Sequence, residues 1–161
     1  DIERLMKLAG VDSTLPKNLT TGLKINISWQ TWYPACSTTP WQLEGVIQTL
    51  KNLGYTDLVG IHNDTVVVDT SVGETNNKHR FVTEKQGIPC EYLFQENFEW
   101  IRFEPKKPFL VLDKVYPDGV YIPKTLIGKN MVHLPTVKTH VFTTITGQTH
   151  PRRATETPSS A

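Results

Sequence analysis

The segment from residue 23 to residue 61 constrains the fold more than any other part of the sequence. Its first six residues alternate apolar and polar side chains, which is typical of a strand. A helix start follows at residues 39–42, where Thr39 suits the N-cap, Pro40 the first turn and Gln42 the capping box. Gly54 marks the helix end, and residues 57–61 are typical of a second strand. Strand, helix and strand in about forty residues form a βαβ unit, so we expect the two strands to be parallel.

The rest of the chain extends this unit to an α/β domain. Residues 2–9 and 76–86 are predicted helices, and residues 109–112 and 129–134 are predicted strands. The predicted helix of the βαβ unit carries an apolar stripe made of Trp41, Leu43, Val46, Ile47, Leu50 and Leu53. We therefore predict a Rossmann-like βαβ core with a mostly parallel sheet flanked by helices, and with room for one antiparallel edge strand. This α/β domain spans residues 1–147, and the Thr/Pro/Ser-rich segment 148–161 is predicted to be a disordered tail.

Composition excludes several classes of function. Lys and Arg number 17 against 16 Asp and Glu, for a net charge of +1, so we expect no nucleic-acid partner. The two cysteines, Cys36 and Cys90, cannot supply the roughly four ligands of an iron–sulfur cluster or a structural zinc site. The longest apolar stretch, residues 109–112, is too short to cross a bilayer. Because no secretion leader is visible, we expect a cytoplasmic protein with no membrane partner.

Polar side chains gather where three predicted strands end. Open parallel sheets bind ligands at the carboxyl ends of their strands. If these three strands are parallel neighbours, their polar ends meet at one edge of the sheet. The three groups are Asn26 and Ser28, then His62, Asn63 and Asp64, and finally Lys138, Thr139 and His140.

The last group suggests chemistry as well as position. Lys138 and His140 lie two residues apart, and the Thr/Gly-rich run that follows offers donors for an oxyanion. We predict that Lys138 holds an anion and that His140 acts as an acid–base group or metal ligand, oriented by Asp64 or His62. Packing or surface roles remain the alternative for each histidine. The predicted catalytic residues are Lys138, His140 and Asp64; the predicted cofactor-binding residues are Asn26, Ser28, Thr38, Thr39, Thr143, Thr146 and Gly147; the predicted metal ligands are His62 and His140.

Three further features bear on the site. Thr38 and Thr39 precede a helix start, where they either cap the helix or help to bind an anion. His79, between two basic residues, is predicted on a solvated helix face. An aromatic cluster lines a pocket for a flat ligand, or instead forms core or a contact with another domain. That cluster consists of Trp29, Trp32, Tyr33 and Trp41.

Three segments, residues 24–28, 39–47 and 132–140, resemble the DUF362 family. The most specific element is the Leu-Pro-x-x-Lys-x-His pattern at residues 134–140, followed by Thr and Gly. Members of this family are uncharacterised bacterial and archaeal proteins, many of which carry a separate ferredoxin-like iron–sulfur module. The resemblance covers residues 20–147 and implies an α/β fold and a role for Lys138 and His140, without naming a reaction.

The resemblance also implies that this chain is the amino-terminal part of a larger protein. In relatives the Thr-x-Thr-Gly stretch continues into a Lys-Asn pair and a Gly-rich helical remainder, whereas here residues 148–153 read Gln-Thr-His-Pro-Arg-Arg. Two functions therefore remain open. The first is binding, with or without catalysis, of an anionic small molecule or a divalent metal at the strand ends. The second is a non-catalytic docking or oligomerisation module, a truncated piece of a larger redox-associated protein that pairs with a second copy or a missing carboxyl-terminal domain.

Overall fold

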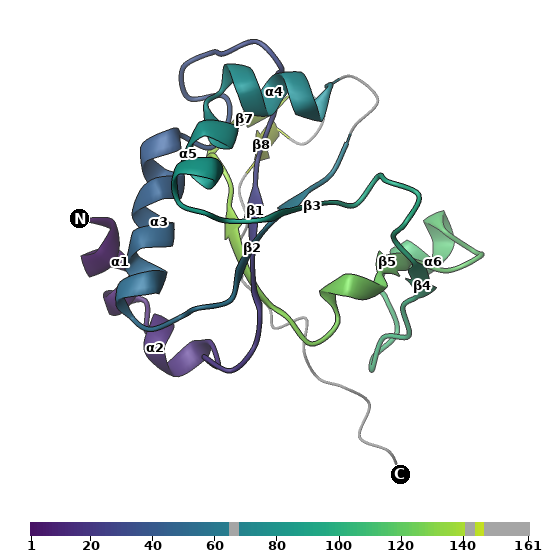
Figure 1. The fold of residues 1–161 in the computed structure, drawn as a ribbon. Helices are drawn as coiled ribbons and strands as arrows, with labels where there is room; N and C mark the ends of the chain where they lie inside the picture. Colours follow the sequence, from purple (N-terminus) through teal and green to yellow (C-terminus); the bar gives the residue numbers. More distant parts are fainter. Residues whose placement is uncertain (65–67, 141–143, 147–161) are drawn as a thin grey trace.

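A computed structural model describes residues 1–64, 68–140 and 144–146. Its centre is a four-stranded sheet with the order β3-β2-β1-β6 (Figure 1). Every neighbouring pair in this sheet is parallel, so the predicted parallel α/β core is confirmed. The four strands are β1 (Thr21–Ile25), β2 (Leu58–His62), β3 (Cys90–Tyr92) and β6 (Asn130–Leu134). Thr143, Gly147 and the tail predicted at residues 148–161 lie outside the described residues.

Antiparallel pairing occurs in two smaller sheets rather than at an edge of the main one. β4 (Trp100–Arg102) pairs with β5 (Tyr121–Pro123), and β7 (Lys138–His140) pairs with β8 (Thr144–Thr146). The β4–β5 pair lies to one side of the main sheet, beside the short helix α6 (Leu112–Val115) and the 3-10 turn η1 (Lys124–Leu126) (Figure 1). The antiparallel edge strand that the sequence left room for is therefore not part of the main sheet in the described ranges.

Helices cover one face of the sheet. They are α1 (Ile2–Leu8), α2 (Val11–Thr14), α3 (Pro40–Asn52), α4 (Thr70–Asn76) and α5 (His79–Lys85). The main core forms where Leu43, Ile47 and Leu50 of α3 pack against Leu23 and Ile25 of β1. A second cluster on the other face joins β2 and β6 to the segment after β3. Among the described residues, no helix is both long enough and apolar enough to pass through a bilayer.

The predicted βαβ unit is present, and its apolar stripe is buried or partly buried except at one position. Trp41, in the first turn of α3, is 68% exposed. The helix predicted at residues 76–86 is present as α5, and α4, which the sequence did not predict, ends just before it. Lys78 adopts a left-handed backbone (φ 65°), which ends α4 and starts α5 in a new direction.

The strand predicted at residues 109–112 is wrong. Leu110 is 93% exposed, and Leu112 begins α6 instead. A short apolar run does not by itself distinguish strand from helix, and this run has no neighbouring strand to pair with in the described structure.

Candidate functional site

The carboxyl ends of β1 and β2 meet at a cavity of about 200 Å³. Because the two strands are parallel neighbours, their polar ends face the same space. The polar residues that line it are Lys24, Asn26, His62, Asn63, Asp64 and Thr70. Asn26 of the first group and His62, Asn63 and Asp64 of the second line this cavity, while the binding role of Asn26, Ser28, His62 and Asp64 stays a prediction.

Lys24 is the residue of this cavity that sequence reasoning missed. Its ammonium is partly buried and donates to the carbonyl of Ile25 at 2.9 Å. Burial lowers the pKa of Lys24. Within the described ranges no carboxylate pairs with it. The sequence feature that could have indicated it is a lysine inside a strand that the pattern already placed in a parallel sheet.

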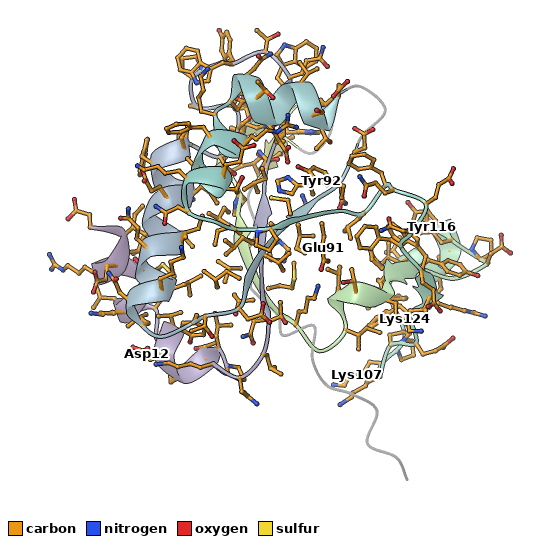
Figure 2. The ribbon with its side chains drawn as sticks, in the orientation of Figure 1. Asp12, Glu91, Tyr92, Lys107, Tyr116 and Lys124 are labelled. Carbon is orange, nitrogen blue, oxygen red and sulfur yellow. The ribbon has the colours of Figure 1, made fainter. Side chains whose placement is uncertain are left out.

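A buried carboxylate lies against the end of β2. Glu74, on α4, has one oxygen 2.6 Å from Nδ1 of His62, and both side chains are only 2% exposed. Its other oxygen accepts from the hydroxyl of Tyr92 at 3.0 Å and from Arg80 at 3.3 Å. The ring of His62 also stacks on Tyr92, with centroids 5.3 Å apart. Figure 2 shows Tyr92 at the end of β3, beneath α4.

These contacts shift the ionisation of the carboxylate and the phenol. Burial alone would raise the pKa of Glu74, but contacts with His62, Tyr92 and Arg80 outweigh it and leave that pKa below its usual value of 4.5. Burial, together with the charge of Glu74, raises the pKa of Tyr92 to about 12. Glu74 is therefore an anion and Tyr92 a neutral donor at neutral pH. Sequence reasoning missed Glu74, because its partners on β2 and β3 lie far away along the chain.

His79 does not lie on a solvated helix face as predicted. It is fully buried at the start of α5, and its Nε2 lies 2.6 Å from the carbonyl oxygen of Thr38. Burial lowers the pKa of His79, so the neutral ring donates to this carbonyl. The basic neighbours suggested exposure, but the turn at Lys78 directs the histidine side of α5 inward.

The polar residues just before α3 form hydrogen bonds that connect neighbouring segments of the chain. The hydroxyl of Thr38 accepts from the backbone of Asn26 at 2.8 Å and donates to the carbonyl of Leu134 at 2.5 Å. It thereby ties the ends of β1 and β6 together. The backbone of Ser28 donates to Ser37 Oγ. Thr39 is the N-cap residue of α3, yet its hydroxyl makes no capping hydrogen bond, so the predicted capping box does not form.

Lys138 and His140 lie on β7, which follows β6 after a short connection. Figure 1 shows the β7–β8 hairpin toward the same end of the molecule as the carboxyl end of β1. Thr146, on β8, donates its hydroxyl to the carbonyl of Thr136 at 3.1 Å. The residues that line the cavity come from the β1 and β2 ends, so the approach of Lys138 and His140 to it stays a prediction. In the described part of the chain, no group of three or more His, Cys, Asp or Glu side chains is arranged to hold a metal.

Comparison of the sequence with known proteins gives a match that covers the whole cavity region. A family model described as a domain of unknown function, DUF362, matches residues 21–149. The matched range runs from β1 through the β7–β8 hairpin and includes every residue that lines the cavity. No match was found among curated proteins or among solved structures. The chain therefore belongs to the DUF362 family.

Proposed function

We propose that this domain binds an anionic small molecule in the cavity at the carboxyl ends of β1 and β2. The observation that supports this most directly is Lys24, a partly buried ammonium in a polar cavity with no carboxylate partner in the described ranges. An ammonium withdrawn from water without a counter-ion is unfavourable. An anionic ligand would supply that counter-ion. Asn26 adds a side-chain amide that can donate to phosphate or carboxylate oxygens.

Two of the residues that line the cavity already make contacts within the protein, so the ligand would bind to side chains whose positions are fixed. The ring of His62 is fixed between Glu74 and Tyr92. Asp64 accepts from the hydroxyl of Thr70 at 3.1 Å. In this proposal Lys138 and His140 supply a second cation and an acid–base group from the β7–β8 hairpin. A divalent metal held by His62 and His140 is the alternative ligand.

Replacing Lys24 with glutamine should weaken the binding of inorganic phosphate about tenfold to a hundredfold. Hydrogen bonds to charged groups contribute about 1.5–3 kcal/mol, and glutamine keeps the bond to Ile25 while it removes the charge. Titration followed by nuclear magnetic resonance measures the dissociation constant and identifies the amides that shift.

Lys51 offers a matched control. It is exposed and also donates to a backbone carbonyl, that of Gln86, at 2.6 Å. Lys51→Gln should leave phosphate binding unchanged. The proposal is wrong if the unmodified protein does not bind phosphate, or if the two lysine variants bind it equally well.

A second candidate function is docking, and an exposed aromatic cluster favours it. The four side chains Trp29, Trp32, Tyr33 and Trp41 are between 49% and 69% exposed. No charged residue occurs between Lys24 and Glu44, so this loop is uncharged as well as aromatic. Large exposed aromatic patches are typical of contact surfaces between proteins. The partner we infer is a second copy of this chain.

Replacing Trp32, Tyr33 and Trp41 together with serine should abolish self-association without unfolding the domain. The three side chains are exposed, so their loss removes contact area with a partner and little of the core. Sedimentation velocity over a range of concentrations gives the oligomeric state. A protein that is monomeric at the highest concentration before substitution excludes docking between copies.

A further inference from the structure

A thiol and a buried imidazole share one small space above Gly60. A Cβ placed on Gly60 would lie 2.8 Å from Sγ of Cys90 and 2.9 Å from Nε2 of His62. These three residues come together because β2 and β3 pair in register, with Gly60 opposite Cys90 and His62 opposite Tyr92. Because residue 60 has no side chain, the sulfur and the imidazole nitrogen both pack close to the point that a Cβ would occupy.

The imidazole is oriented for proton transfer. Its Nδ1 lies 2.6 Å from Glu74, while its Nε2 makes no hydrogen bond with any residue that the structure describes, although the side chain is only 2% exposed. The Nδ1 contact is close but not aligned as a hydrogen bond, so it acts chiefly through charge. A carboxylate beside Nδ1 favours the tautomer that carries its hydrogen there, which leaves a lone pair on Nε2. That lone pair faces the space into which the thiol projects.

Cys90 lies at the edge of the sheet. It is on β3, an edge strand, and it is partly buried. Its thiol forms no disulfide; it makes a weak contact of 3.9 Å with the carbonyl of Ile88 and lies against the hydroxyl of Thr83. The other ionisable groups that influence it are Glu74, Arg80, Glu84 and Tyr92.

We propose that Cys90, His62 and Glu74 form a reactive thiol site for a small electrophilic carbon compound. Nε2 of His62 takes the thiol proton as Sγ forms a bond to the electrophilic carbon. The bond from that carbon to its leaving group breaks, and the leaving group departs with the electron pair. The imidazolium then returns its proton to water. Cys90 is the nucleophile, His62 the general base and Glu74 a positioning residue.

Burial raises the pKa of the Cys90 thiol, so little thiolate forms spontaneously at neutral pH. The contribution of a base to the reaction of this thiol can therefore be measured. Without a base, the rate of alkylation would rise only in the alkaline range of the thiol itself. With His62 as the base, the rate near neutral pH should depend on the imidazole beside the sulfur.

The test is alkylation by iodoacetamide of the full chain in the absence of phosphate, followed by intact mass. Cys36→Ser leaves Cys90 as the only thiol, and Cys90→Ser leaves Cys36 as the matched control. In the Cys36→Ser background, His62→Gln should slow alkylation near neutral pH at least tenfold, about the smallest effect expected of a general base. Glu74→Gln should slow it less and shift the pH profile. The reaction of Cys36 should be unaffected by either substitution.

The outcomes separate catalysis from structural damage. Loosening of the fold by His62→Gln would expose Cys90 and speed its alkylation, so a slower reaction cannot come from unfolding. Glu74→Gln gives a second, shape-conserving variant if His62→Gln does not fold. The proposal is overturned if Cys90 reacts at the same rate with and without His62, or only in the alkaline range. Because phosphate is absent, this result is independent of anion binding at Lys24.

Discussion

Replacement of Glu74 with alanine should lower the free energy of unfolding by about 2–4 kcal/mol, because it removes the contacts that a buried carboxylate makes with three side chains. The carboxylate is 2% exposed and contacts His62, Tyr92 and Arg80 at once. Without it, the buried imidazole of His62 loses its carboxylate neighbour and Tyr92 and Arg80 lose an anionic acceptor, and that loss of partners accounts for most of the effect. Chemical denaturation followed by fluorescence measures the change.

The control is an exposed pair on the same side of the sheet. Glu44 lies 2.8 Å from Lys85, and Glu44→Ala should have little effect on the free energy of unfolding because water screens the pair. Equal effects of the two substitutions would show that burial of Glu74 does not strengthen its contacts.

The effect of Glu74 should also depend on pH. Its pKa is lower in the folded protein than its usual value of 4.5, so its contribution is complete above that pH and is lost as the pH falls through the folded pKa. The stability difference between the native chain and Glu74→Ala should therefore narrow below pH 4.5. A constant difference across the acid range would contradict a folded carboxylate that is held as an anion.

Replacement of Thr38 with valine should cost about 2–4 kcal/mol, since it leaves two buried backbone groups without partners. The hydroxyl of Thr38 is 1% exposed and holds both the amide of Asn26 and the carbonyl of Leu134. Valine keeps the shape of threonine and removes only these contacts. Thermal unfolding of both proteins by calorimetry measures the loss.

Thr38→Ser is the complementary substitution, because serine keeps the hydroxyl and loses one methyl group. It should cost about 1 kcal/mol, the usual effect of one buried carbon. If Thr38→Ser is as destabilising as Thr38→Val, packing of the methyl group rather than the hydroxyl joins β1 to β6.

Local signals were enough to predict the central unit of the fold. The start of α3 at Pro40 and its apolar stripe depend on residues within a few turns of one another. The parallel arrangement followed from the length of the connection, since a capped helix between two strands requires a crossover. For the same reason the sequence correctly predicted that the ends of β1 and β2 meet.

The contacts that sequence reasoning missed all depend on tertiary position. Glu74 meets His62 only because α4 lies over the end of β2. His79 is buried because the left-handed turn at Lys78 redirects the chain, and a lysine rarely adopts that backbone. Lys24 was overlooked because strand alternation does not tell which polar residues face a cavity. Neither periodicity nor composition contains this information.

The strand order has a consequence for how the chain reaches its fold. β1 is central, and its two neighbours lie at very different distances along the chain, with Thr21 opposite both Leu58 and Asn130. As synthesis proceeds from the amino terminus, β1 and β2 can pair early, whereas the other edge of β1 stays unpaired until β6 has been synthesised. Closure of that long loop carries an entropic cost, so docking of β6 is the slow contact expected to limit the folding rate.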